Sequence, residues 1–168
     1  MYNVYTAGLV TRYHTDPVLS RVNQTVAEHT QHMLALLYYL KPTPPSPELV
    51  KNIVFHDYGE HYTGDMPFLM KRRCSKLKRL LDQHEQDGFN TLGIPQEDTD
   101  SLLTEEDMDW LSFLDRLECT FFVLLHAPFL RARKDWVDNN NEALELAERL
   151  GVKDRTNELI RSMINRYD

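Results

Sequence analysis

Histidine and acidic side chains are concentrated directly after the short apolar run 53–55. His56 and Asp57 come first, and residues 56–65 together hold three carboxylates and two imidazoles. Carrying such groups into a core is costly unless they have partners, and a cation satisfies imidazole and carboxylate together. The pattern therefore predicts that His56 and Asp57 bind a metal ion.

Other segments must complete the shell of that ion. Adjacent residues on a helix point about 100° apart, so one ion can take both His56 and Asp57 only at a helix end. A second helix is predicted from Val26 onward, with Thr25 as its N-cap and Glu28 three residues later. This places His29 one turn into the helix, as a candidate third ligand.

A fourth ligand is predicted in the apolar run 110–125. Asp115 lies in the middle of this run, where a lone carboxylate would cost several kcal/mol or be protonated. A cation removes that cost. We therefore expect Asp115 to join His29, His56 and Asp57.

This order of ligands, with each on a predicted helix, resembles the HD-domain metal phosphohydrolases. Within that family the chain is similar to the HD-domain 5′-deoxynucleotidases and the small phage dATP triphosphohydrolases. The resemblance covers about residues 8–125 and extends to Arg12-Tyr13, Thr25–His29, His56–Pro67 and Lys71. It implies an all-α fold, a single HD-type helical bundle over residues 1–168 whose C-terminal helices complete it.

The resemblance also implies catalytic residues. Glu60 follows His56 by one turn and matches a glutamate that acts on the water or the leaving oxygen, so it is expected to be the general acid/base. Asp65, after the Thr63-Gly64 turn, matches a residue that helps the reaction and holds the sugar.

The same resemblance implies substrate-binding residues. Arg12 is the expected phosphate clamp, because a guanidinium grips two phosphate oxygens in its plane. Tyr13 stands where the family usually has Trp packed on the nucleoside, Lys71 has the spacing of the relatives' lysine, and His61 is expected at the pocket rim or in a hydrogen bond. His32 is expected not to bind metal, and the histidines that carry no pattern are expected to be structural: His14, His84 and His126.

The expected cofactor is one divalent transition metal. Two imidazoles and two carboxylates suit Mn²⁺, Co²⁺, Fe²⁺, Ni²⁺ or Zn²⁺ better than Ca²⁺ or Mg²⁺. Open positions on the ion would hold water and a substrate oxygen, and water bound there becomes hydroxide near neutral pH. A second ion could accompany a triphosphate.

The expected activity is that of a dATP triphosphohydrolase, in which metal hydroxide attacks the α-phosphorus and deoxyadenosine and triphosphate are released. The basic residues between Lys71 and Arg79 favour a triphosphate tail, although a solvated helix face explains those beyond Arg73 equally well. A 5′-deoxynucleotidase that acts on monophosphates is the alternative. A hydrolase of a signalling nucleotide and a non-catalytic, metal-stabilised interaction module are further alternatives.

Composition limits the class of protein. With 42% hydrophobic and 27% charged residues over 168 positions, the chain is expected to form one soluble globular domain. A net charge of -7 argues against duplex nucleic acid as a partner. No run is apolar enough to cross a membrane, and Cys74 and Cys119 are expected to stay reduced, so a cytoplasmic location is predicted, in the host cell if the protein is phage-encoded. The resemblance implies a homo-oligomer.

Helices are predicted throughout and no strand is predicted. Gly88 and the turn at Gly93 are expected to end one helix, and Thr104 is expected to start another. The expected helices lie within 1–13 and at 26–40, 47–57, a short piece from Pro67, 71–89, 105–128, 139–150 and 154–166.

Overall fold

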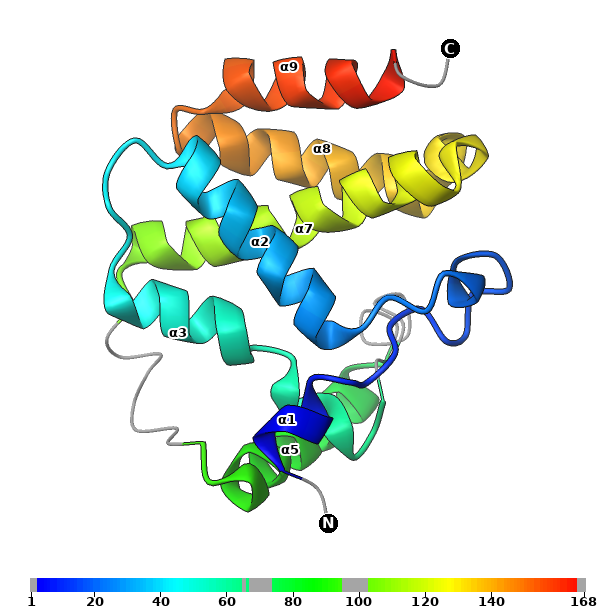
Figure 1. The fold of residues 1–168 in the computed structure, drawn as a ribbon, viewed down its shortest axis with the longest axis vertical. Helices are drawn as coiled ribbons and strands as arrows, with labels where there is room; N and C mark the ends of the chain where they lie inside the picture. Colours follow the sequence, from blue (N-terminus) through cyan, green and yellow to red (C-terminus); the bar gives the residue numbers. More distant parts are fainter. Residues whose placement is uncertain (1–2, 65, 67–73, 95–102, 166–168) are drawn as a thin grey trace. The chain divides into compact units, whose positions relative to one another are not determined.

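The computed structural model describes residues 3–64, 66, 74–94 and 103–165, and over these residues the chain is all-α, as predicted (Figure 1). The β-structure found there is one isolated antiparallel bridge, between Thr11 and Thr25. The helices are α1 (Val4–Ala7), α2 (Val26–Leu40), α3 (Pro47–Phe55), α5 (Ser75–Leu92), α7 (Glu105–His126), α8 (Lys134–Arg149) and α9 (Lys153–Ile164), with 3-10 turns η1 (Leu19–Arg21), η2 (Tyr58–His61) and η3 (Pro128–Ala132).

The chain divides into two compact units. The first contains Met1–Thr30 and Val54–Thr99, and the second contains Gln31–Ile53 and Asp100–Asp168. The single domain expected over residues 1–168 stays a prediction. Among the described residues, no helix has both the length and the apolar character that crossing a membrane requires.

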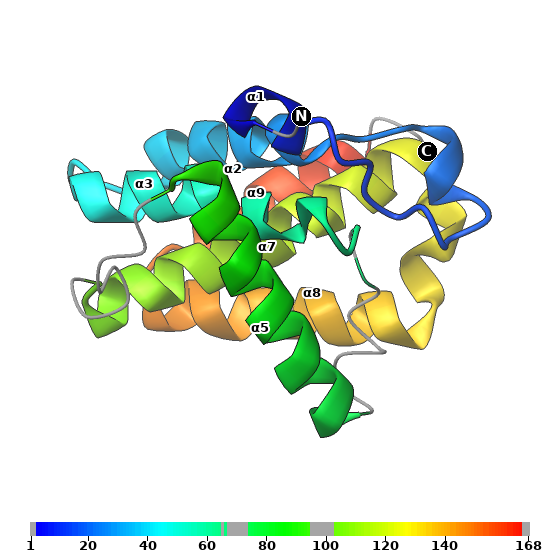
Figure 2. The ribbon, with the colours of Figure 1, turned by 90° about the horizontal axis from the view of Figure 1, so that it is seen from below.

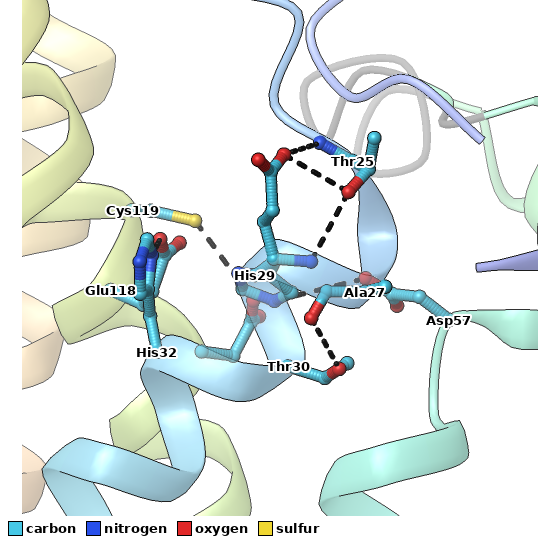
Figure 3. Close-up of polar contacts among 10 residues, drawn as sticks. Thr25, Ala27, His29, Thr30, His32, Asp57, Glu118 and Cys119 are labelled. Carbon is cyan, nitrogen blue, oxygen red and sulfur yellow. Dashed lines mark hydrogen bonds and ion pairs between the residues drawn. The ribbon is translucent and has the colours of Figure 1, made fainter. Parts of the chain in front are cut away.

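Helix α2 has the predicted bounds because its first turn caps itself. The Glu28 amide donates to Thr25 Oγ1 at 3.2 Å, and the Thr25 amide donates to Glu28 Oε2 at 2.8 Å (Figure 3). This reciprocal pair satisfies donors that a helix start leaves open. The cap fixes the turn that carries His29.

The first helix is shorter than expected. α1 ends at Ala7 instead of near residue 12, because the chain then pairs with the start of α2: Gly8 and Val10 carbonyls accept from the Ala27 and Val26 amides, each at 2.9 Å. Gly8 allows this close approach, since an added Cβ would lie 3.2 Å from the Ala27 Cβ of α2 and 2.8 Å from the Tyr58 hydroxyl of η2.

Helix α5 does not end at Gly88, one of its two predicted end signals, and the other, the turn at Gly93, is confirmed. It continues to Leu92 and ends at Gly93, whose φ of 65° is in the left-handed region that favours glycine. Gly88 is buried where the helix packs against the backbone of Gly59 in η2, so it serves close packing and not termination. The expected helical piece at Pro67 and the expected helix start at residue 71 lie outside the described residues.

The core of the second unit is formed by side chains of α2, α3, α7 and α8, and α7 and α8 lie side by side in Figures 1 and 2. Thr104 caps α7 as predicted, with Asp107 as its reciprocal partner. α8 starts at Lys134, earlier than the predicted 139, directly after η3. The largest fully buried side chains of α7 are Trp110, Phe113, Leu114 and Leu117.

Candidate metal centre

His29, His56 and Asp57 come together within the first unit and could hold a metal ion. One ligand atom from each lies within 4.8 Å of the others. Asp57 Oδ2 is 3.8 Å from His29 Nε2 and 3.3 Å from His56 Nε2, and the two imidazole centroids are 5.4 Å apart. Figure 3 shows His29 on α2 facing Asp57.

The backbone between α3 and η2 lets neighbouring residues share one ion. α3 ends at Phe55, two residues earlier than predicted, so His56 and Asp57 lie beyond its last residue. Asp57, with φ −100° and ψ 0°, precedes η2, and its carbonyl accepts the Glu60 amide at 3.1 Å. The chain therefore leaves helical geometry at the point where a regular helix would have turned the two side chains apart.

The spacing of the donor atoms suits a metal ion. Two ligands bound at about 2.1 Å in tetrahedral geometry lie roughly 3.4 Å apart, and the measured separations of 3.3 and 3.8 Å bracket that value. The His29 side chain is fully buried, and those of His56 and Asp57 are 16% and 20% exposed. The site is thus closed on the α2 side and reachable by water at the other two ligands.

Glu60 and His61 follow on the same turn and are both buried. His61 Nδ1 lies 3.0 Å from the Tyr58 carbonyl oxygen, a hydrogen-bond distance, and the ring packs 4.1 Å from the ring of Tyr62. The Glu60 carbonyl accepts the amides of Thr63 and Gly64 at 3.1 and 2.7 Å. Burial raises the pKa of the Tyr58 phenol, so the first side chain of this turn stays neutral.

Arg12 is buried in the same unit. Its amide donates to the Gln24 carbonyl at 2.8 Å, and its guanidinium lies 5.2 Å from the centroid of the Tyr13 ring, within range of a cation–π contact. Tyr13 has φ 56°, a left-handed conformation that is rare for a bulky residue. Such strain persists where the surrounding structure holds it, and it is found preferentially at functional sites.

The remaining predicted site residues belong to the second unit or fall outside the described residues. Asp115 belongs to the second unit, where it is half-buried on α7 with Cys119 Sγ 3.9 Å from its Oδ1. Its role as fourth ligand stays a prediction. Asp65 and Lys71 lie outside the described residues. His32, to which the sequence assigns no ligand role, lies with Nδ1 3.2 Å from Glu118 Oε1.

Sequence reasoning gave no role to His14, yet its ring lies against the turn that follows Glu60. His14 Cε1 is 3.4 Å from the position that a Cβ on Gly64 would take. A single histidine carries no pattern, so only a contact between distant parts of the chain reveals it.

Comparison with family models, curated proteins and solved structures finds no match for the chain. The resemblance to the HD-domain phosphohydrolases rests on the residues quoted above. The function that this resemblance implies is accordingly a proposal.

Proposed function

We propose that the protein is a metal-dependent phosphohydrolase that acts on deoxynucleotides. The observation that carries the proposal is the group formed by His29, His56 and Asp57, in which two imidazole nitrogens and a carboxylate oxygen converge. Three protein ligands leave coordination positions for water and substrate. A divalent ion bound there would polarise a phosphate oxygen and lower the pKa of its water.

Glu60 is proposed as the general acid/base. It is buried in η2, three residues after Asp57, and its amide is bonded to the Asp57 carbonyl. Its carboxylate would take a proton from the attacking water or give one to the leaving oxygen, which requires a group held in place near the reacting atoms. Asp65 would assist and hold the sugar, as the resemblance implies.

Arg12 is proposed as the phosphate clamp. The guanidinium stays charged at every physiological pH, and its planar donors match two phosphate oxygens. The contact with the Tyr13 ring restrains it, so less entropy is lost when phosphate binds. Tyr13 would pack on the nucleoside, and Lys71 would add positive charge.

The preferred substrate is dATP, split into deoxyadenosine and triphosphate. The resemblance to the phage enzymes and the basic residues Lys76, Lys78 and Arg79 on α5 favour a triphosphate. Lys78 is already paired with Asp82 at 2.9 Å, so its charge is partly offset. Hydrolysis of deoxynucleoside monophosphates is the second candidate.

The deciding experiment is a substrate panel with product analysis. The Mn²⁺- or Co²⁺-loaded protein is incubated with dATP, dAMP, ATP and dGTP, and the released phosphate, pyrophosphate or triphosphate is identified. Triphosphate from dATP supports the proposal, and phosphate from dAMP alone would select the monophosphatase.

A structural metal is the competing interpretation, because the complete burial of His29 would also suit a site that only ties α2 to the segment after α3. In that case the metal-loaded protein hydrolyses none of the nucleotides, while removal of the metal still lowers the stability of the protein. Activity with any member of the panel excludes this interpretation.

A further inference from the structure

We infer that His14 binds a phosphate oxygen of the substrate, an inference that rests on the proposed function. His14 follows the proposed clamp, Arg12, and lies against the turn that follows the proposed acid/base, Glu60. The two segments are far apart in the sequence but belong to the same unit, and the imidazole lies 3.4 Å from the position that a Cβ on Gly64 would take.

The turn beneath His14 is fixed to the site. Gly64 has φ 70°, and its amide donates to the Glu60 carbonyl at 2.7 Å. The Thr63 hydroxyl donates to the Gly64 carbonyl at 3.2 Å. The turn beside His14 is therefore bonded to the backbone of Glu60.

The backbone on the other side is fixed as well. The Arg12 amide is bonded to Gln24, and the Tyr13 carbonyl accepts the Asp16 amide at 2.9 Å. With Tyr13 in the left-handed conformation, the chain turns sharply between Arg12 and His14.

The ring remains available to a ligand. His14 Nε2 is 4.0 Å from the Cβ position of Gly64, while the side chain as a whole is exposed to solvent. An imidazole N–H donates to phosphate, and it also carries positive charge when protonated. A polyphosphate tail carries several negative charges, so His14 supplies a donor at the exposed side in addition to the buried Arg12 guanidinium and the proposed lysines.

The test compares His14→Ala and His14→Gln in the Mn²⁺-loaded full chain. We expect His14→Ala to raise the KM for dATP about tenfold with kcat little changed, as for loss of a hydrogen bond to a charged group. His14→Gln keeps an N–H donor and should recover part of the loss. Because His84 is a solvent-exposed histidine on α5, His84→Ala is the matched control and should leave KM unchanged.

Calorimetric titration with inorganic triphosphate separates this inference from the proposed function. If the wild type hydrolyses no nucleotide, the proposed function fails, yet weaker triphosphate binding by His14→Ala would still support the phosphate contact. The inference is wrong if the wild type does not bind triphosphate, or if His14→Ala binds it as tightly as the wild type. A fall in kcat at constant KM would also overturn it, since His14 would then act only by supporting the turn after Glu60.

Discussion

Gly59 and Gly88 pack backbone against backbone within the first unit. A Cβ on Gly88 would collide with the Gly59 carbonyl oxygen, and a Cβ on Gly59 would lie 2.5 Å from the Glu85 carbonyl oxygen. Two glycines thus let α5 approach η2 more closely than any side chain permits. Because η2 carries Glu60, this contact also supports the proposed acid/base.

Gly88→Ala is expected to destabilise the protein by about 1–3 kcal/mol, the usual cost of forcing an extra carbon into a packed site. The gain in helix propensity, about 1 kcal/mol, offsets part of that cost. Urea unfolding measures the difference. Gln86→Ala, at an exposed position of the same helix, is the control and should change stability by less than about 0.5 kcal/mol. Equal stability of Gly88→Ala and wild type would contradict the packing argument.

Removal of a metal ligand should abolish tight metal binding. His56→Ala and Asp57→Asn each take one donor from the group with His29, and we expect affinity for Co²⁺ to fall more than about 100-fold, beyond the loss caused by outer-shell changes. Calorimetric titration of the metal-free protein measures it. His32→Ala is the control, because His32 contacts Glu118. If Asp57→Asn binds Co²⁺ as tightly as the wild type, the proposed metal centre is wrong.

Asp115→Asn tests the predicted fourth ligand. We expect it to lower Co²⁺ affinity at least about tenfold, since the carboxylate charge is lost while the shape is kept. Cys119→Ser removes the thiol 3.9 Å from the same carboxylate and should leave affinity close to that of the wild type. If Asp115→Asn binds Co²⁺ normally, the shell is completed by another group.

Glu60→Gln should separate acid/base action from metal binding. We expect kcat to fall about 10²- to 10⁴-fold, the usual contribution of such a residue, with metal affinity unchanged. Single-turnover rates and metal titration on one preparation measure both. Glu158→Gln, at an exposed position on α9, is the control. Loss of metal by Glu60→Gln would show that Glu60 is a ligand and not the acid/base.

His126 should make the protein less stable in acid. Burial is the main cause that lowers its pKa below the ordinary 6.5, and His32 lowers it further while Glu118 raises it. As pH falls through 6.5, the unfolded chain takes up this proton before the folded one, so stability falls until the folded-state pKa is passed. The effect will be small because the ring is largely exposed and screened.

His126→Gln removes the titrating imidazole. The variant should therefore lose less stability than the wild type when the pH falls from about 7.5 to 5.5, a range around the ordinary histidine pKa. Urea midpoints at the two pH values measure the difference. Parallel losses in the two proteins would show that His126 does not contribute.

Local chemistry made much of the fold predictable. The Thr25 and Glu28 cap set the start of α2, the proline-rich segment 42–47 set its end, and the Thr104 cap set the start of α7. These signals act within a few residues, so the sequence carries them in full. The order of imidazoles and carboxylates along the chain likewise indicates a metal site, because these side chains are common ligands of divalent transition ions.

Packing between distant segments decided the rest. Gly88 is a helix-breaking residue by propensity, and only the backbone of Gly59 against it explains why α5 continues. His29 meets His56 and Asp57, and His14 meets Gly64, because the chain closes long loops whose cost is repaid by burial elsewhere in the unit. The sequence therefore identifies the residue types that can bind a metal, whereas their convergence on one point is a property of the folded chain.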